Sequence, residues 1–152
     1  MTVYSATIDI KGKAGRIGQQ LTASGTYTLV GGITGHASTG DTILFENIIP
    51  RGGAKVVAVQ VVSPELDTNA SPTGTFIVGN SDDDNGFVIT ENCGLPVVAP
   101  ANGKQLSVTG TGALIGTAVT NRDIIVEYTA ALATSATSGA IRLNVILEGT
   151  SA

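Results

Sequence analysis

The stretch Ile-Arg-Leu-Asn-Val-Ile-Leu-Glu, residues 141–148, alternates apolar and polar side chains along most of its length. In an extended chain this spacing puts four aliphatic residues on one side: Ile141, Leu143, Val145 and Leu147. A period of two predicts a β-strand with one face against a core and the other toward solvent. The stretch 123–130 repeats the arrangement through Ile124, Val126 and Tyr128, so the chain is expected to form half-buried sheets.

Similar β-rich runs recur along the chain, separated by glycine, proline, asparagine and aspartate, which favour tight turns. Strands are predicted at 1–10, 26–30, 42–49, 55–62, 75–78, 87–90, 105–109, 123–130 and 141–148. No window of roughly ten or more residues has the apolar spacing of an amphipathic helix. About nine short strands predict an all-β fold, an antiparallel two-sheet sandwich that is jelly-roll-like. An antibody-type domain is not expected, because the chain has no Trp and one Cys.

The period of two also predicts which residues form the core: Ile8, Leu44, Val57, Val59, Ile77, Val88, Ile124, Val126, Leu143 and Val145. The run Val56–Val62 is different, because it is apolar on both faces. Such a run is typical of a central strand that has a second apolar contact outside the core. Another subunit would supply that contact, so the chain is expected to form a homo-oligomer.

Composition excludes several classes of function. Eight basic and twelve acidic residues give a net charge of −4, which argues against a nucleic-acid-binding protein. Cys93 has no second cysteine to pair with, and the lone His36 cannot supply a clustered zinc site. No run approaches the ~18 apolar residues of a membrane span, and the first residues do not resemble a signal peptide. We therefore expect synthesis in the cytoplasm, no cofactor, no metal and no membrane partner.

Three motifs have a chemical interpretation that competes with a purely structural one. The segment Gly110–Gly116 resembles a nucleotide-binding loop, but too few residues follow it for the required helix, so a glycine-rich turn is expected. The turn Ser81–Gly86 contains Asp82, Asp83 and Asp84 and leaves open whether a cation binds there, although a solvated hairpin is favoured. A Cys93–His36 nucleophilic pair has no local support, and no catalytic residue is predicted.

The segment 11–18 carries the only local concentration of positive charge, at Lys11, Lys13 and Arg16, among three glycines. It predicts an N-terminal strand and flexible arm over residues 1–23, followed by a single sandwich domain over 24–152. Two interpretations stay open for the arm: a solvated linker, or a docking element for an acidic partner surface.

Four segments together resemble a known family: residues 27–30, 39–43, 48–56 and 75–80, the last followed by the Asp-rich turn. This pattern, over about residues 24–92, is similar to head decoration or cement proteins of tailed bacteriophages. The resemblance implies a non-enzymatic virion protein on the capsid exterior, commonly a homotrimer, that bridges neighbouring major capsid subunits. No contact residue of the family is carried over to this chain.

Two other classes of function compete with that expectation. The first is a jelly-roll carbohydrate- or receptor-binding module of a phage or bacterial surface. Sugar-binding platforms usually expose Trp and Tyr, and this chain has no Trp and three Tyr. The second is a cupin-like enzyme, which needs several converging metal ligands that one His does not provide.

Overall fold

The protein is described by a computed structural model that covers residues 3–11, 20–28, 38–94, 105–135 and 140–149. These residues form eleven strands, which are β1 (Val3–Ser5), β2 (Thr7–Lys11), β3 (Gln20–Thr28), β4 (Thr42–Phe45), β5 (Ala54–Pro64), β6 (Thr75–Gly79), β7 (Val88–Asn92), β8 (Gln105–Thr109), β9 (Ala118–Val119), β10 (Ile124–Ala130) and β11 (Ala140–Glu148). None of the described residues is helical. The same part of the chain accordingly holds no helix long and apolar enough to cross a membrane.

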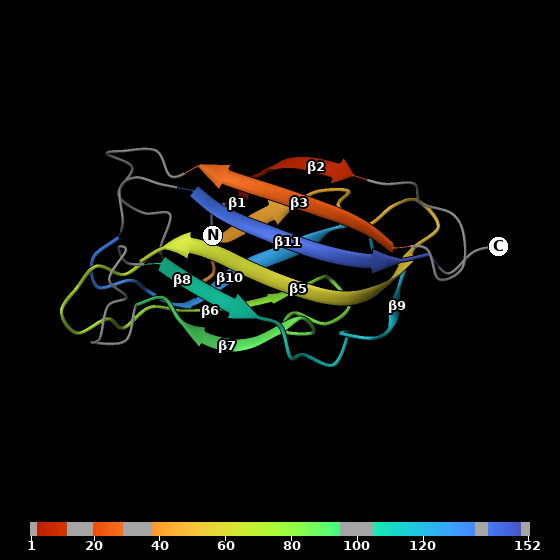
Figure 1. Cartoon of the computed structure of the whole chain (residues 1–152). Helices are drawn as coiled ribbons and strands as arrows, with labels where there is room; N and C mark the ends of the chain where they lie inside the picture. The colour runs from red at the N-terminus through yellow and green to blue at the C-terminus, as the bar shows by residue number, and fades with distance from the viewer. Residues whose placement is uncertain (1–2, 12–19, 29–37, 95–104, 136–139, 150–152) are drawn as a thin grey trace.

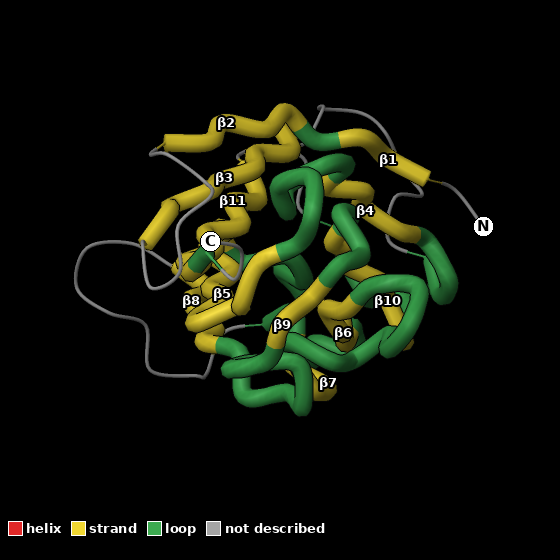
Figure 2. Tube along the Cα trace, turned by 90° about the vertical axis from the view of Figure 1, so that its right-hand side faces the viewer, coloured by secondary structure: helices red, strands yellow, loops and turns green. Residues whose placement is uncertain are grey.

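The strands form two sheets that face each other. Sheet A has the order β1-β4-β10-β6-β7, and sheet B has the order β2-β3-β11-β5-β8, with β9 paired to β5. Figure 1 looks onto sheet B with sheet A behind it, and Figure 2 shows the two layers from one end. The predicted all-β, jelly-roll-like sandwich is confirmed. Its one parallel pair among the described strands is β1 with β4.

The first two strands belong to different sheets although only Ala6 separates them. Val3 pairs with Thr42 in sheet A, and Thr7 pairs with Thr26 in sheet B. The Ala6 N–H donates to the Leu44 carbonyl at 2.9 Å, which continues the pairing through the crossing. One short segment therefore supplies the edge strand of both sheets and holds these two edges together.

The core lies between the sheets and is built from the inward residues of both. The largest completely buried side chains include all three phenylalanines and one tyrosine, namely Phe45, Phe76, Phe87 and Tyr128. Most of the predicted core residues are indeed buried: Val59, Ile77, Val88, Ile124, Val126, Leu143 and Val145. The central position predicted for the doubly apolar strand is confirmed too, because β5 lies between β11 and β8.

Three residues expected in the core are only half-buried, so that prediction is wrong for Ile8, Leu44 and Val57. Ile8 packs against the core from the edge strand β2. In β4 the inward residues are Ile43 and Phe45, which places Leu44 on the outer face.

Val57 is half-buried for a different reason, because the pairing of β5 with β11 shifts register near it. Val56 and Val59 are buried on either side of the shift, while Val57 and Ala58 between them are half-buried. A shift of this kind breaks the strict alternation on which the prediction relied.

Some observed strand boundaries also differ from the predicted ones. The strand expected at 42–49 ends at Phe45, and Ile48 and Ile49 are buried in the turn that follows. The Ile49 N–H donates to the Arg122 carbonyl, so this turn is tied to the start of β10. The strand expected at 26–30 begins at Gln20. The division of the chain at residue 24 stays a prediction.

One end of the sandwich is organised by the buried carboxylate of Asp67. Its Oδ2 accepts hydrogen bonds from the N–H groups of Thr73, Gly74 and Ala133 at 2.9, 3.0 and 2.9 Å. Its Oδ1 accepts from Thr134 at 3.0 Å and from Asn69 at 3.3 Å. The Asp67 N–H in turn donates to the Cys93 carbonyl at 3.1 Å. The Asp67 side chain thereby links its own loop to the loop after β10, and the Asp67 backbone ties both of them to the end of β7.

The hydrogen bonds to Asp67 also determine its charge. Burial by itself raises the pKa of a carboxyl group, because it disfavours the ionised form. Here the N–H groups of Gly74, Ala133, Thr134 and Thr73 outweigh burial and lower the pKa of Asp67 to about 2, from 3.8. The carboxylate is therefore ionised at neutral pH, and that charge-assisted bonding stabilises the two loops.

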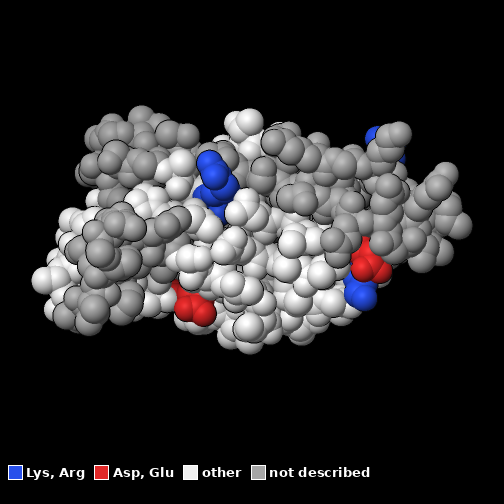
Figure 3. Space-filling model, in the orientation of Figure 1, with Lys and Arg blue, Asp and Glu red and all other residues white. Residues whose placement is uncertain are grey.

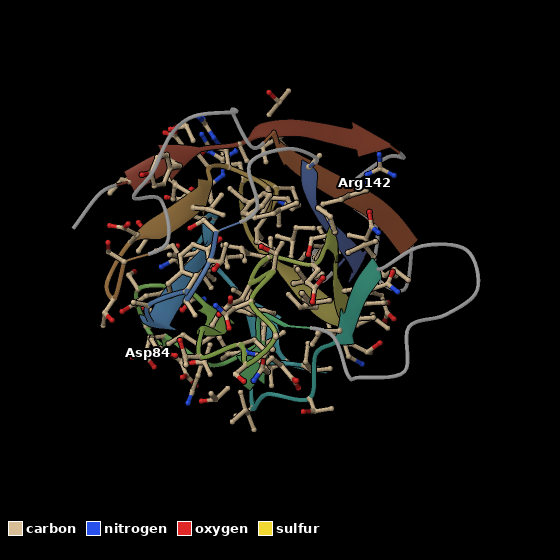
Figure 4. All side chains as sticks on the ribbon, turned by 90° about the vertical axis from the view of Figure 1, so that its left-hand side faces the viewer. Asp84 and Arg142 are labelled. Atoms are coloured by element: carbon tan, nitrogen blue, oxygen red, sulfur yellow. The ribbon has the colours of Figure 1, made fainter. Side chains whose placement is uncertain are left out.

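We predict that Asp67→Asn lowers the free energy of unfolding by about 3 kcal/mol, because an amide cannot satisfy five buried N–H groups. Urea unfolding at pH 7 measures the change. Asp84→Asn is the matched control, since Asp84 is exposed on the turn labelled in Figure 4, and it should shift stability by less than about 0.5 kcal/mol. Equal stability of the two variants would contradict the role of Asp67.

We also predict an acid transition that depends on this residue. The pKa of Asp67 is lower in the folded chain than in the unfolded one, so acid protonates the unfolded chain first. The contribution of Asp67, about 2 kcal/mol, is present above pH 4 and is lost as the pH falls toward 2. The stability difference between the parent and Asp67→Asn should therefore narrow over that range. A difference that is constant from pH 7 to pH 2 would show that the charge has no part in it.

Candidate functional site

The glycine-rich segment 110–116 joins the two sheets. The Gly110 N–H donates to the Val59 carbonyl of β5 at 2.7 Å, and the Gly112 N–H donates to the Phe87 carbonyl next to β7 at 2.9 Å. A Cβ on Gly112 would collide with the Gly86 carbonyl, so close backbone approach requires glycine there. These two N–H groups already donate to backbone carbonyls of the fold, and no helix begins at this segment. Its function is structural, as the missing helix predicted.

The Asp-rich turn is closed by its own hydrogen bonds. The Asn80 side-chain oxygen accepts from the N–H groups of Asp82 and Asp83 at 2.9 and 3.0 Å. The Asn80 N–H donates to the Asp83 carbonyl at 2.9 Å. No three acidic, His or Cys side chains converge on a metal-sized site anywhere in the described part of the chain. The turn therefore has the geometry of a solvated connection between β6 and β7.

Cys93 is completely buried behind the Asp67 loops. Burial raises the pKa of its thiol to about 12, and the negative charge of Asp67 adds to that effect. A cysteine acts as a nucleophile through its thiolate, which is not populated at neutral pH with such a pKa. His36, the other half of the hypothetical pair, lies outside the described residues. Cys93 is thus a packing residue.

The predicted docking residues are placed only in part. Lys11 is the last residue of β2, where its backbone pairs with Thr22 at the edge of sheet B. Lys13 and Arg16 lie outside the described residues, and so does most of the predicted arm. The docking function of these three cations stays a prediction.

The outer face of sheet B is broad and carries few charges. Figure 3 shows this face, with a few blue and red side chains, one of each lying side by side, on an otherwise uncharged surface wherever it is not grey. A polar ladder crosses its centre: Asn144 donates to Gln60 at 3.5 Å, and Gln60 donates to Ser107 at 3.1 Å. Around the ladder lie the aliphatic residues of what we call the sheet B strip, namely Val57, Ala58, Val62 and Ile146.

The outer face of sheet A carries a second apolar feature, which the sequence did not suggest. Each of the five strands contributes one aliphatic residue to that face. We call this set the sheet A band: Val3 of β1, Leu44 of β4, Ile125 of β10, Ile77 of β6 and Ile89 of β7. No single segment displays the band, because its members come from strands that meet only in the folded sheet. The described residues therefore place aliphatic side chains on the outer faces of both sheets.

Comparison with known proteins identifies what the chain is similar to. No protein-family model matches it, and no curated protein does. It is similar to a chain of the cyanophage Pam1 capsid asymmetric unit, with 26% sequence identity over 91% of each chain and a TM-score of 0.63. It also shares its fold with a chain of the capsid of Ralstonia phage GP4, with 18% identity, 93% of this chain and 91% of that chain covered, and a TM-score of 0.64. The similarity to the Pam1 chain supports a structural role in a bacteriophage virion.

Proposed function

We propose that this chain is a head decoration protein that binds the outside of a bacteriophage capsid and stabilises contacts between major capsid subunits. The observation that carries the proposal is the likeness to a Pam1 capsid chain over nine-tenths of both chains. A likeness of that extent concerns the whole sandwich and not a local motif. It agrees with the resemblance carried by residues 27–80 of the sequence.

The surface of the sandwich favours this function over a sugar-binding module. Sugar platforms present the faces of aromatic rings. Tyr128 is buried in the core, and Tyr4 is half-buried against it, so neither offers a free ring face. The segments that resembled a nucleotide loop and a metal loop are occupied by hydrogen bonds of the fold. What the described part presents to a partner is flat sheet, which suits protein docking.

Decoration requires many weak contacts that act together. Ordering a flexible segment costs about 1 kcal/mol or more per residue, so a single arm would bind weakly by itself. A trimer that engages three subunits makes its second and third attachments intramolecular, which raises their effective concentration. In this mechanism the arm residues supply charge complementarity and the sandwich supplies shape.

The first prediction concerns the arm. Replacing Lys11, Lys13 and Arg16 by serine should weaken binding to shells assembled from the major capsid subunit alone, most clearly at low salt, because screening reduces the contribution of exposed charges. A matched control replaces Arg51, Lys55 and Arg142 by serine, which removes the same charge from elsewhere on the chain. Sedimentation of protein with shells measures binding. If both triple variants bind alike at every salt concentration, the arm is only a linker.

The second prediction concerns assembly. The chain should form a homotrimer through the sheet B strip, because Val57, Val62 and Ile146 leave apolar surface on a sheet whose opposite face already fills the core. Sedimentation equilibrium should give three times the monomer mass, and Ile146→Thr should shift the equilibrium toward monomer. A parent chain that is monomeric both in solution and on shells would contradict the trimer.

A further inference from the structure

The direction of the sheet A band follows from strict alternation in its strands. In β4 and β10 the core residues Ile43, Phe45, Ile124 and Val126 alternate with outward positions. Leu44 and Ile125 occupy those outward positions and are paired with each other in register. In β6 the core residues Phe76 and Val78 flank Ile77, which is buried but is not part of the core cluster. The band thus lies outside the sandwich.

The two ends of the band are the most exposed large apolar residues of the described chain. Val3 on the edge strand β1 is 55% exposed, and Ile89 on the opposite edge strand β7 is 53% exposed. Between them Leu44 and Ile125 are half-buried and paired with each other, and Ile77 is 6% exposed and is paired with Glu127. A scattered exposed aliphatic residue is ordinary on a protein surface, whereas several that gather on one face of a sheet are typical of an interaction site.

Charge separates this face from the other one. The strands of sheet A contain two carboxylates, Glu91 and Glu127, and no Lys or Arg. The strands of sheet B contain three cations, Lys11, Lys55 and Arg142, and two carboxylates, Asp9 and Glu148, of which Glu148 is paired with Lys55. Figure 4 labels Arg142 on the sheet B side of the molecule. A partner of sheet A therefore finds no cation on its strands and must bring its own.

The carboxylate of Glu127 is the group that a cation of the partner would have to contact. It is half-buried on the outer face, opposite Thr42 on one side and Ile77 on the other. Covering the band removes water from this carboxylate, which is unfavourable unless a cation replaces the water. Two copies of this chain docked sheet A to sheet A would bring two such carboxylates together. A second copy that placed Arg142 of its sheet B on this face would form a head-to-tail contact, which does not close and builds an open filament. The face is therefore suited to a different chain.

We propose that the outer face of sheet A is the surface that lies on the capsid, against an apolar patch of a major capsid subunit that presents Lys or Arg to Glu127. This orientation rests on the proposed function and names the surface through which it operates. The sheet B strip on the opposite face is left for contacts between copies. The two sheets of the sandwich thus have different partners.

The test compares variants of sheet A with a control variant on shells assembled from the major capsid subunit alone. Val3→Thr combined with Ile89→Thr keeps β-branched side chains on exposed edge positions, so the fold is retained, and binding should weaken roughly tenfold or more. Glu127→Gln should weaken binding at low salt and reduce its salt dependence. Ala113→Ser combined with Ala118→Ser is the matched control and should bind like the parent, because both positions are exposed and lie outside the sheet A band, the sheet B strip and the arm. All proteins are compared at concentrations where sedimentation shows the same oligomeric state, with circular dichroism and thermal unfolding as checks of the fold.

The outcomes separate this inference from the proposed function. A parent chain that does not bind shells overturns the proposed function and this orientation with it. A parent that binds, together with a Val3/Ile89 double variant that binds equally well, leaves decoration standing and overturns the sheet A assignment. A double variant that instead loses self-association in solution shows that a second copy covers the band, which also overturns it.

Discussion

The loops at one end of this sandwich depend on the negative charge of Asp67. Five backbone N–H groups from two stretches of chain, 69–74 and 133–134, converge on one carboxylate that has no access to water. Without this carboxylate, the backbone N–H groups of these loops would lack hydrogen-bond partners beside the apolar core. Because the carboxylate satisfies them together, β6, β7 and β10 keep their relative positions where they enter and leave that end. The flat outer faces of the sheets are presented on this fixed frame.

The assembly role needs these faces to differ, and they do. Sheet A combines the sheet A band with carboxylates, and sheet B combines a polar ladder and the sheet B strip with strand-borne charges of both signs. A sandwich with two equivalent faces would be free to stack on itself into open arrays. Because the two faces differ in charge and polarity, each favours a different partner surface, and only a few side chains determine this difference.

The strands could be predicted from the sequence where alternation is strict, as in Ile141–Glu148 and Ile124–Ala130. Prediction failed where the period is interrupted, since the register shift in β5 moves Val57 out of the core. Asp67 could not be identified, because its donors at Thr73, Ala133 and Thr134 are brought to it only by the fold. The sheet A band was missed for the same reason, with one residue on each of five strands. Composition argued against a metal or nucleophilic centre, because the chain has one His and one Cys, and this stays a prediction.

The order of strands in sheet B has a consequence for how the protein is made. Of the described strands β11 is synthesised last, yet it lies between β3 and β5 and pairs with both. While the chain is still emerging from the ribosome, the β2–β3 pair and the β5–β8 pair therefore have no partner to join them. The edges of β3 and β5 that face β11 stay unpaired until Ala140–Glu148 has been synthesised. The sheet is completed late, by pairing between strands that are far apart in the sequence. Nascent chains truncated before β11 would therefore expose unpaired strand edges that can associate with other chains.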